Sequence, residues 1–130
     1  GIREFLNARC DEDEAAARRV SGSGSWHAYI AGDGRWAIET VPDGDPDAVI
    51  GHEAMCRHMV RHDPAHVLRE VEAKRRHVEH YAEVERLLDG SDGHIRNELL
   101  SVRRAYWLVL VDDAQVYRDH PDYRGEEWKP

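Results

Sequence analysis

The chain has 130 residues, of which 41% are hydrophobic and 34% charged, and its formal net charge is −8. This length suits one domain with a buried core, and the four Trp and five Tyr residues argue against a disordered chain. The negative charge opposes nucleic-acid binding, which needs a cationic surface to displace counterions from phosphate. The basic run Lys74-Arg75-Arg76 lies among glutamates, so we interpret it as a solvated helix face.

The cysteines and the apolar runs of the sequence predict the cellular compartment of the protein. Two cysteines, Cys10 and Cys56, are too few for a disulfide framework, and their apolar-facing positions predict free buried thiols. No stretch has the pattern of a secretory signal. The longest apolar run, residues 105–111, is much shorter than the roughly 20 residues that a membrane-spanning helix needs. The sequence therefore predicts a cytoplasmic protein with no membrane partner.

The first third of the chain predicts a helix followed by a hairpin. Apolar residues recur at helical spacing over residues 2–20, and the Ser-Gly repeat of residues 21–25 ends that helix. Two short alternating stretches flank a Gly-Asp-Gly turn at residues 32–34, which predicts a β-hairpin over residues 26–41. A two-stranded hairpin is marginal alone and must pack on helices.

Two further helices meet at the clearest boundary in the sequence. Asp47 is a candidate N-cap for a helix over residues 47–61. Asp63 is a strong N-cap and Pro64 suits the first position of the next helix. Apolar spacing of three and four then continues over residues 64–88.

The last helix is predicted over residues 94–117. Six of its apolar residues fall on one face: Ile95, Leu99, Val102, Tyr106, Val109 and Val116. The central run, residues 105–111, is apolar all round and would by itself also suit a buried strand, but its periodic flanks favour a helix. An extended tail follows over residues 118–130. Trp128 is expected to anchor this tail to the body, and a mobile tail is the alternative.

Together these elements predict an α+β fold that is mostly α. We expect an antiparallel helical bundle of about four helices with one small β-hairpin, forming a single domain over residues 1–130.

Nine histidines are the most conspicuous candidates for chemistry, because histidine is the commonest metal ligand and titrates near neutral pH. His58 and His62 are four residues apart, as are His62 and His66, and such pairs can share a metal on a continuous helix. Pro64 interrupts the second pair. Neither pair belongs to a recognised metal motif, so scattered surface and half-buried histidines are the simpler interpretation.

If a metal is bound, carboxylates must complete the site. The candidate ligands are His62, Glu70, His120 and Asp13. No other cofactor is predicted, because the chain has neither a phosphate-binding glycine loop nor a nucleophile motif.

Arginine and aromatic side chains are candidates for partner binding. Arg69 and Arg75 could clamp a phosphate or a partner's carboxylates, although pairing with neighbouring glutamates is the simpler account. Tyr123 and Trp128 in the tail are the aromatic candidates.

Three stretches resemble a family of small proteins of unknown function from actinobacteria and their phages. They are residues 5–9 together with residues 11–14, residues 61–75 (RHDPAHVLREVEAKR) and the tail, residues 120–128 (HPDYRGEEW). The resemblance implies a bacterial or phage cytoplasm and carries over no activity. It draws attention to the following residues: Asp13, His62, Asp63, Arg69, Glu70, Glu72, His120 and Asp122.

Two functions from different classes follow from these observations. The first is a small non-enzymatic protein-interaction or regulatory module that binds a protein partner or a second copy through the long helix or the tail. The alternative is a metal-binding protein or metal-dependent hydrolase that uses a divalent metal held by His and carboxylate ligands.

Overall fold

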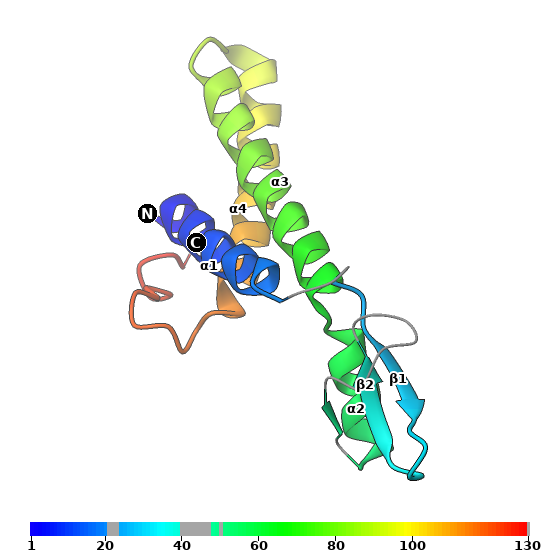
Figure 1. Ribbon diagram of the computed structural model, residues 1–130. Coiled ribbons are helices and arrows are strands. Elements are labelled where there is room, and N and C mark those ends of the chain that lie inside the picture. The colour runs from blue at the N-terminus through cyan, green and yellow to red at the C-terminus, as the bar shows by residue number, and fades with distance from the viewer. Residues whose placement is uncertain (21–23, 40–47, 50, 130) are drawn as a thin grey trace. The chain divides into compact units, whose positions relative to one another are not determined.

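A computed structural model describes residues 1–20, 24–39, 48–49 and 51–129. Its elements are α1 (Ile2–Arg18), β1 (His27–Ile30), β2 (Trp36–Glu39), β3 (Ala48–Val49), α2 (Glu53–Arg61), α3 (Pro64–Leu88) and α4 (Gly93–Gln115) (Figure 1). The prediction of a mostly helical α+β protein with four helices and a β-hairpin is confirmed. The chain divides into two compact units, one made of Gly1–Glu12 with Val71–Pro130 and the other of Asp13–Glu70.

Most predicted helix bounds agree with the structure to within two residues. α3 spans the predicted residues 64–88, whereas α1 and α4 each end two residues early. Residues 105–111 are helical, because they lie inside α4. None of the helices in the described ranges combines the length and the apolar content that crossing a membrane requires.

The predicted helix over residues 47–61 is wrong in its first part. Ala48–Val49 is a strand, and α2 begins only at Glu53. Between them Gly51 has φ +71°, a left-handed conformation that glycine adopts without steric cost and that a helix cannot contain. The Gly51 amide donates to the Trp36 carbonyl at 3.1 Å and so continues the pairing with β2. The proposed cap Asp47 lies outside the described residues.

The second unit contains a three-stranded antiparallel sheet in the order β1-β2-β3. Ile30 pairs with Trp36 next to the turn, and Ala37 pairs with Val49 on the other edge of β2. α2 packs on β1 and β2, and Ala37, Ile38 and Cys56 are buried. The hairpin therefore obtains its core from α2, as a marginal two-stranded hairpin requires.

Asp63 caps α3, as predicted, and also holds a second segment. Its Oδ1 accepts a hydrogen bond from the His66 amide at 2.8 Å, and its Oδ2 accepts one from the Trp26 amide at 3.1 Å. The Ala65 amide donates to the Gly24 carbonyl at 2.8 Å. The start of α3 and the chain leading into β1 are thus fixed to each other within the second unit.

Replacing Asp63 by alanine is expected to lower the free energy of unfolding by about 1–2 kcal/mol, because two backbone amides lose their acceptor. Asp63→Asn is the matched control and should lose less, since asparagine caps as well as aspartate but has only one acceptor oxygen. Urea denaturation followed by circular dichroism measures both variants. An alanine variant as stable as the parent would contradict the assigned cap.

The first unit is built on an antiparallel pair of helices, the Val71–Leu88 part of α3 and α4. Contacts between them run in opposite chain directions: His77 hydrogen-bonds Asp113 at 2.7 Å, and the ring of His80 stacks on Tyr106. At the connecting turn the Leu88 carbonyl accepts a hydrogen bond from Arg96 at 2.9 Å. In Figure 1 the two helices lie side by side.

The N-terminal part of α1 and the tail complete the core of this unit. Its buried residues come from all four segments: Ile2, Phe5, Leu6, Val78, Tyr81, Leu110, Ala114 and Trp128. The predicted anchoring of the tail by Trp128 is confirmed, since this side chain is buried in the cluster. Cys10 and Cys56 are both buried and neither forms a disulfide, as expected.

Candidate functional site

α4 has a buried face and an exposed face, and both are apolar. Leu110 and Ala114 on the inner face are completely buried. On the outer face Ile95 is 63% exposed and Val102 42%, and Val116, the residue that directly follows α4, is 69% exposed. A helix that presents apolar side chains to solvent along most of its length has a surface that a partner can cover.

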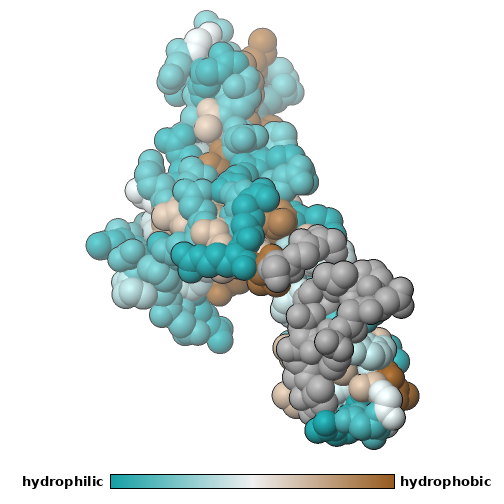
Figure 2. All heavy atoms as spheres, in the orientation of Figure 1, coloured by the Kyte–Doolittle hydropathy of each residue, from teal (hydrophilic) through white to brown (hydrophobic). Residues whose placement is uncertain are grey.

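This outer face contains the residues that the sequence placed on one side of the last helix. Leu99, Tyr106 and Val109, the other three of the six, are half-buried, and Tyr106 is covered by the ring of His80 at a centroid distance of 5.4 Å. Figure 2 shows hydrophobic atoms along the edge of the α3–α4 pair, among hydrophilic side chains. The periodicity of the sequence was correctly identified, but only part of that face packs against the rest of the first unit.

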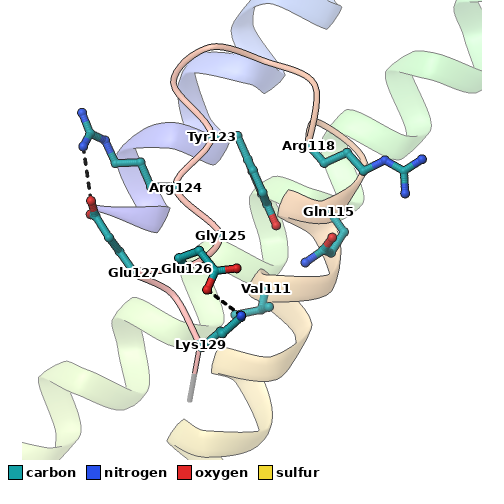
Figure 3. Close-up of a pocket in the computed structure, with 9 residues that line it drawn as sticks. All are labelled: Val111, Gln115, Arg118, Tyr123, Arg124, Gly125, Glu126, Glu127 and Lys129. Carbon is teal, nitrogen blue, oxygen red and sulfur yellow. Dashed lines mark hydrogen bonds and ion pairs between the residues drawn. The ribbon is translucent and has the colours of Figure 1, made fainter.

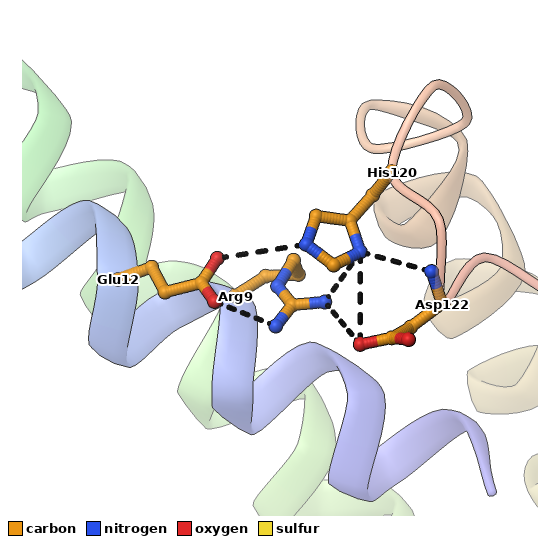
Figure 4. A network of polar contacts seen from close by, with 4 residues as sticks. All are labelled: Arg9, Glu12, His120 and Asp122. Carbon is orange, nitrogen blue, oxygen red and sulfur yellow. Dashed lines mark hydrogen bonds and ion pairs between the residues drawn. The ribbon is translucent and has the colours of Figure 1, made fainter.

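The tail is held to α1 by a polar network around Arg9 (Figure 4). The Arg9 side chain is only 7% exposed. It donates to Glu12 at 2.7 Å and to Nδ1 of His120 at 2.8 Å, and its Nη1 lies 3.6 Å from the Asp122 carboxylate. The guanidinium also lies over the Phe5 ring, 5.2 Å from its centroid. Arg9 thereby joins the first helix to the tail across 111 positions of sequence.

The same network determines which ring nitrogen of His120 carries the proton. This nitrogen faces two donors, the Arg9 guanidinium and the Asp122 backbone amide at 3.1 Å. Neither donor can release its proton at ordinary pH, so Nδ1 must be the acceptor and the proton must sit on Nε2. His120 therefore serves as a hydrogen-bond acceptor that fixes the tail.

A cleft of about 580 Å³ lies between the end of α4 and the tail (Figure 3). Val111 and Tyr123 supply its apolar lining. Two ion pairs border it, Arg124 with Glu127 at 3.3 Å and Lys129 with Glu126 at 2.6 Å. Since these charges are already paired at the surface, the cleft has a mixed rim without a strong preference for one charge.

The ring of Tyr123 packs against Gly125, which has no side chain at that point. A Cβ added at Gly125 would clash with the Tyr123 ring, and the same ring lies 5.4 Å from Trp128, edge to face. The glycine therefore allows the aromatic side chain to fold back onto the tail.

The predicted partner-binding residues are found in different environments. Arg69 is exposed, whereas Arg75 donates to Asp11 at 2.6 Å. Tyr123 is half-buried and Trp128 is buried in its own core. Of the four, Trp128 has the clearest role, which is structural.

The predicted metal ligands fall into both units. His62 is exposed in the second unit, with the rings of His58 and His66 at centroid distances of 4.7 and 5.6 Å. Glu70 accepts a hydrogen bond from His66 at 3.0 Å. Asp13 also belongs to the second unit, whereas His120 belongs to the first. Over the described ranges, no three His, Cys, Asp or Glu side chains are grouped in a way that could hold a metal ion.

The pKa shifts of Tyr81 and Glu83 in α3 have structural causes. Burial raises the pKa of the Tyr81 hydroxyl, and a hydrogen bond to Glu85 raises it further. A hydrogen bond from the Arg86 guanidinium lowers the pKa of the exposed Glu83 carboxylate. Since packing and a surface ion pair account for both shifts, we assign neither group a chemical role.

The site residue that the sequence did not reveal is Arg9. It falls on the apolar stripe of α1, where an arginine is ordinarily interpreted as a residue at the edge of the stripe. The signal that pointed toward it was indirect: residues 5–9, 11–14 and 120–128 were all part of the resemblance, and the structure shows that the first two stretches contact the third.

The fold and these contacts define a small, mostly helical α+β protein with a folded-back tail and an exposed apolar helix face. The chain belongs to a family of unknown function (DUF6221), whose model matches residues 2–130. Neither the curated proteins nor the solved structures contain a match to the chain.

Proposed function

We propose that the protein is a non-enzymatic protein-interaction module that binds its partner through the outer face of α4. The observation that carries this proposal is the exposure of Ile95 and Val102 on one side of a 23-residue helix and of Val116, the residue that directly follows it. Complete burial of such a side chain contributes about 1.5–3 kcal/mol relative to leaving it exposed. A partner that covered all three would therefore gain a substantial apolar contribution.

The spacing of these residues supports a helical partner. Ile95, Val102, Val109 and Val116 follow one another at intervals of seven, the repeat by which helices pack along a common seam. Leu99 and Tyr106 lie between them at steps of four and three, but Tyr106 stacks on His80 and packs against the core, so the residues spaced by seven form the side open to a partner.

The polar residues of the tail also support a binding role over an enzymatic one. Arg9, Glu12, His120 and Asp122 contact one another and thereby hold the tail against α1. Apart from the buried Nε of Arg9, which has no hydrogen-bond partner in the described part of the chain, their polar groups are directed at one another, which explains them without a substrate.

The proposed setting is a bacterial or phage cytoplasm. Two buried cysteines outside any disulfide suit a reducing compartment, and the resemblance described above supports the origin.

Cross-linking tests the proposed surface. A photoreactive benzophenone residue replacing Val102 in cells should form adducts with another polypeptide, because Val102 would lie inside the interface. The same residue replacing Glu79, which is exposed on α3, is the control and should form few or none. Absence of an adduct at position 102, or equal adducts at both positions, would count against the proposal.

A further inference from the structure

We propose that the occupant of the outer face of α4 is a second copy of this chain, paired through a two-fold axis with the two α4 helices antiparallel. This inference rests on the proposed function and adds the identity of the partner and its orientation.

The arrangement of apolar residues on α4 suits a two-fold axis. In a two-fold interface the same surface meets itself, so residue i contacts j and j contacts i. The four residues spaced by seven are symmetric about the Ala105–Tyr106 bond. An antiparallel pair centred there brings Ile95 against the partner's Val116 and Val102 against the partner's Val109.

The centre of this arrangement suits close packing. Ala105 is exposed and has only a methyl group, and the distance between packed helices depends on the side chains at the contact. A small residue at the midpoint allows the flanking valines of both copies to interlock.

The area available is sufficient for a reversible dimer. The 18 residues of α3 from Val71 and the 23 residues of α4 make a face roughly 27 Å long and 20 Å wide. Two such faces would bury about 1,080 Å² in total, slightly above the roughly 1,000 Å² that a specific interface should exceed. We therefore expect a dissociation constant in roughly the micromolar range.

The charges of the chain oppose this pairing, so the dimer is expected to be apolar rather than charge-driven. Each copy has a net charge of −8, so two copies repel and the attraction must be apolar. The antiparallel pairing also brings Glu98 near the partner's Asp112, two like charges at the edge of the seam. Salt screens both effects and should tighten the dimer.

Sedimentation velocity of the full chain over a range of concentrations tests the inference. The parent should change from monomer to dimer, and the dimer should be favoured at high salt. Val102→Lys should weaken dimerisation at least tenfold, because it places a charge in the seam. Leu108→Lys is the matched control, since Leu108 is also 42% exposed but lies about 120° away around the helix. It should leave the dissociation constant within about threefold of the parent.

A charge reversal tests the orientation. Glu98→Lys should tighten the dimer several-fold, because the new lysine would face the partner's Asp112. An unchanged dimer in Val102→Lys, or a weaker one in Glu98→Lys, would overturn the arrangement. A strict monomer that still cross-links through position 102 to a different protein would overturn the second copy and keep the proposed function. A strict monomer without adducts would overturn both.

Discussion

Replacing Trp128 by alanine is expected to release the tail and to lower the free energy of unfolding by about 3–5 kcal/mol. Trp128 is only 6% exposed, and its ring packs against Phe5 at a centroid distance of 5.0 Å. Its carbonyl also accepts a hydrogen bond from the indole of Trp107 at 3.3 Å. Loss of the ring removes the apolar anchor and leaves a cavity beside α1. Urea denaturation followed by circular dichroism measures the loss.

Limited trypsin digestion measures release of the tail separately. Cleavage after Arg124 should be faster in Trp128→Ala than in the parent, because an unanchored segment is accessible to protease. Trp128→Phe is the control that keeps an aromatic anchor and should lose clearly less stability. Equal digestion of parent and alanine variant would mean that the Arg9 network alone holds the tail.

The features that the sequence predicted correctly are those determined by neighbouring residues. The cap at Asp63 and the first-turn Pro64 specify the start of α3 through local geometry, and the structure places that start at Pro64. The turn between β1 and β2 is similarly local, with the Gly34 amide donating to the Ala31 carbonyl at 2.9 Å. Such features depend on a few adjacent side chains and so are readable from one sequence.

The strand β3 was missed because its structure depends on a distant partner. Ala48 and Val49 pair with Ile38 and Ala37 of β2, and a short apolar run does not by itself distinguish a strand from a helix. Gly51 was the available local signal, since a glycine inside a helix is unfavourable relative to alanine.

The candidate site was predictable only in part for the same reason. Periodicity identified the outer stripe of α4, yet which of two apolar faces is buried depends on how α1, α3 and the tail pack. Arg9 and His120 are joined by a contact across 111 positions, which spacing along the chain cannot reveal.

Replacing Leu110 by alanine tests the buried face of α4 independently of its exposed face. The substitution is expected to lower the free energy of unfolding by about 2–5 kcal/mol. Leu110 is completely buried in the core of the first unit, so the substitution removes packed methyl groups and leaves a cavity. Urea denaturation at a protein concentration low enough to keep the chain monomeric measures the effect of the inner face alone.

The matched variants show which face holds the monomer together. Leu110→Met should cost less than about 1.5 kcal/mol, because it nearly conserves volume. Val102→Ala should cost less than about 1 kcal/mol in the monomer, since Val102 is 42% exposed, but it should weaken self-association. A large monomer destabilisation by Val102→Ala would mean that the outer face is already covered within the chain and would remove the reason for a partner. A small destabilisation by Val102→Ala, together with a large one by Leu110→Ala, would show that the exposed stripe does not stabilise the monomer. Binding would then be the simplest explanation for its apolar residues.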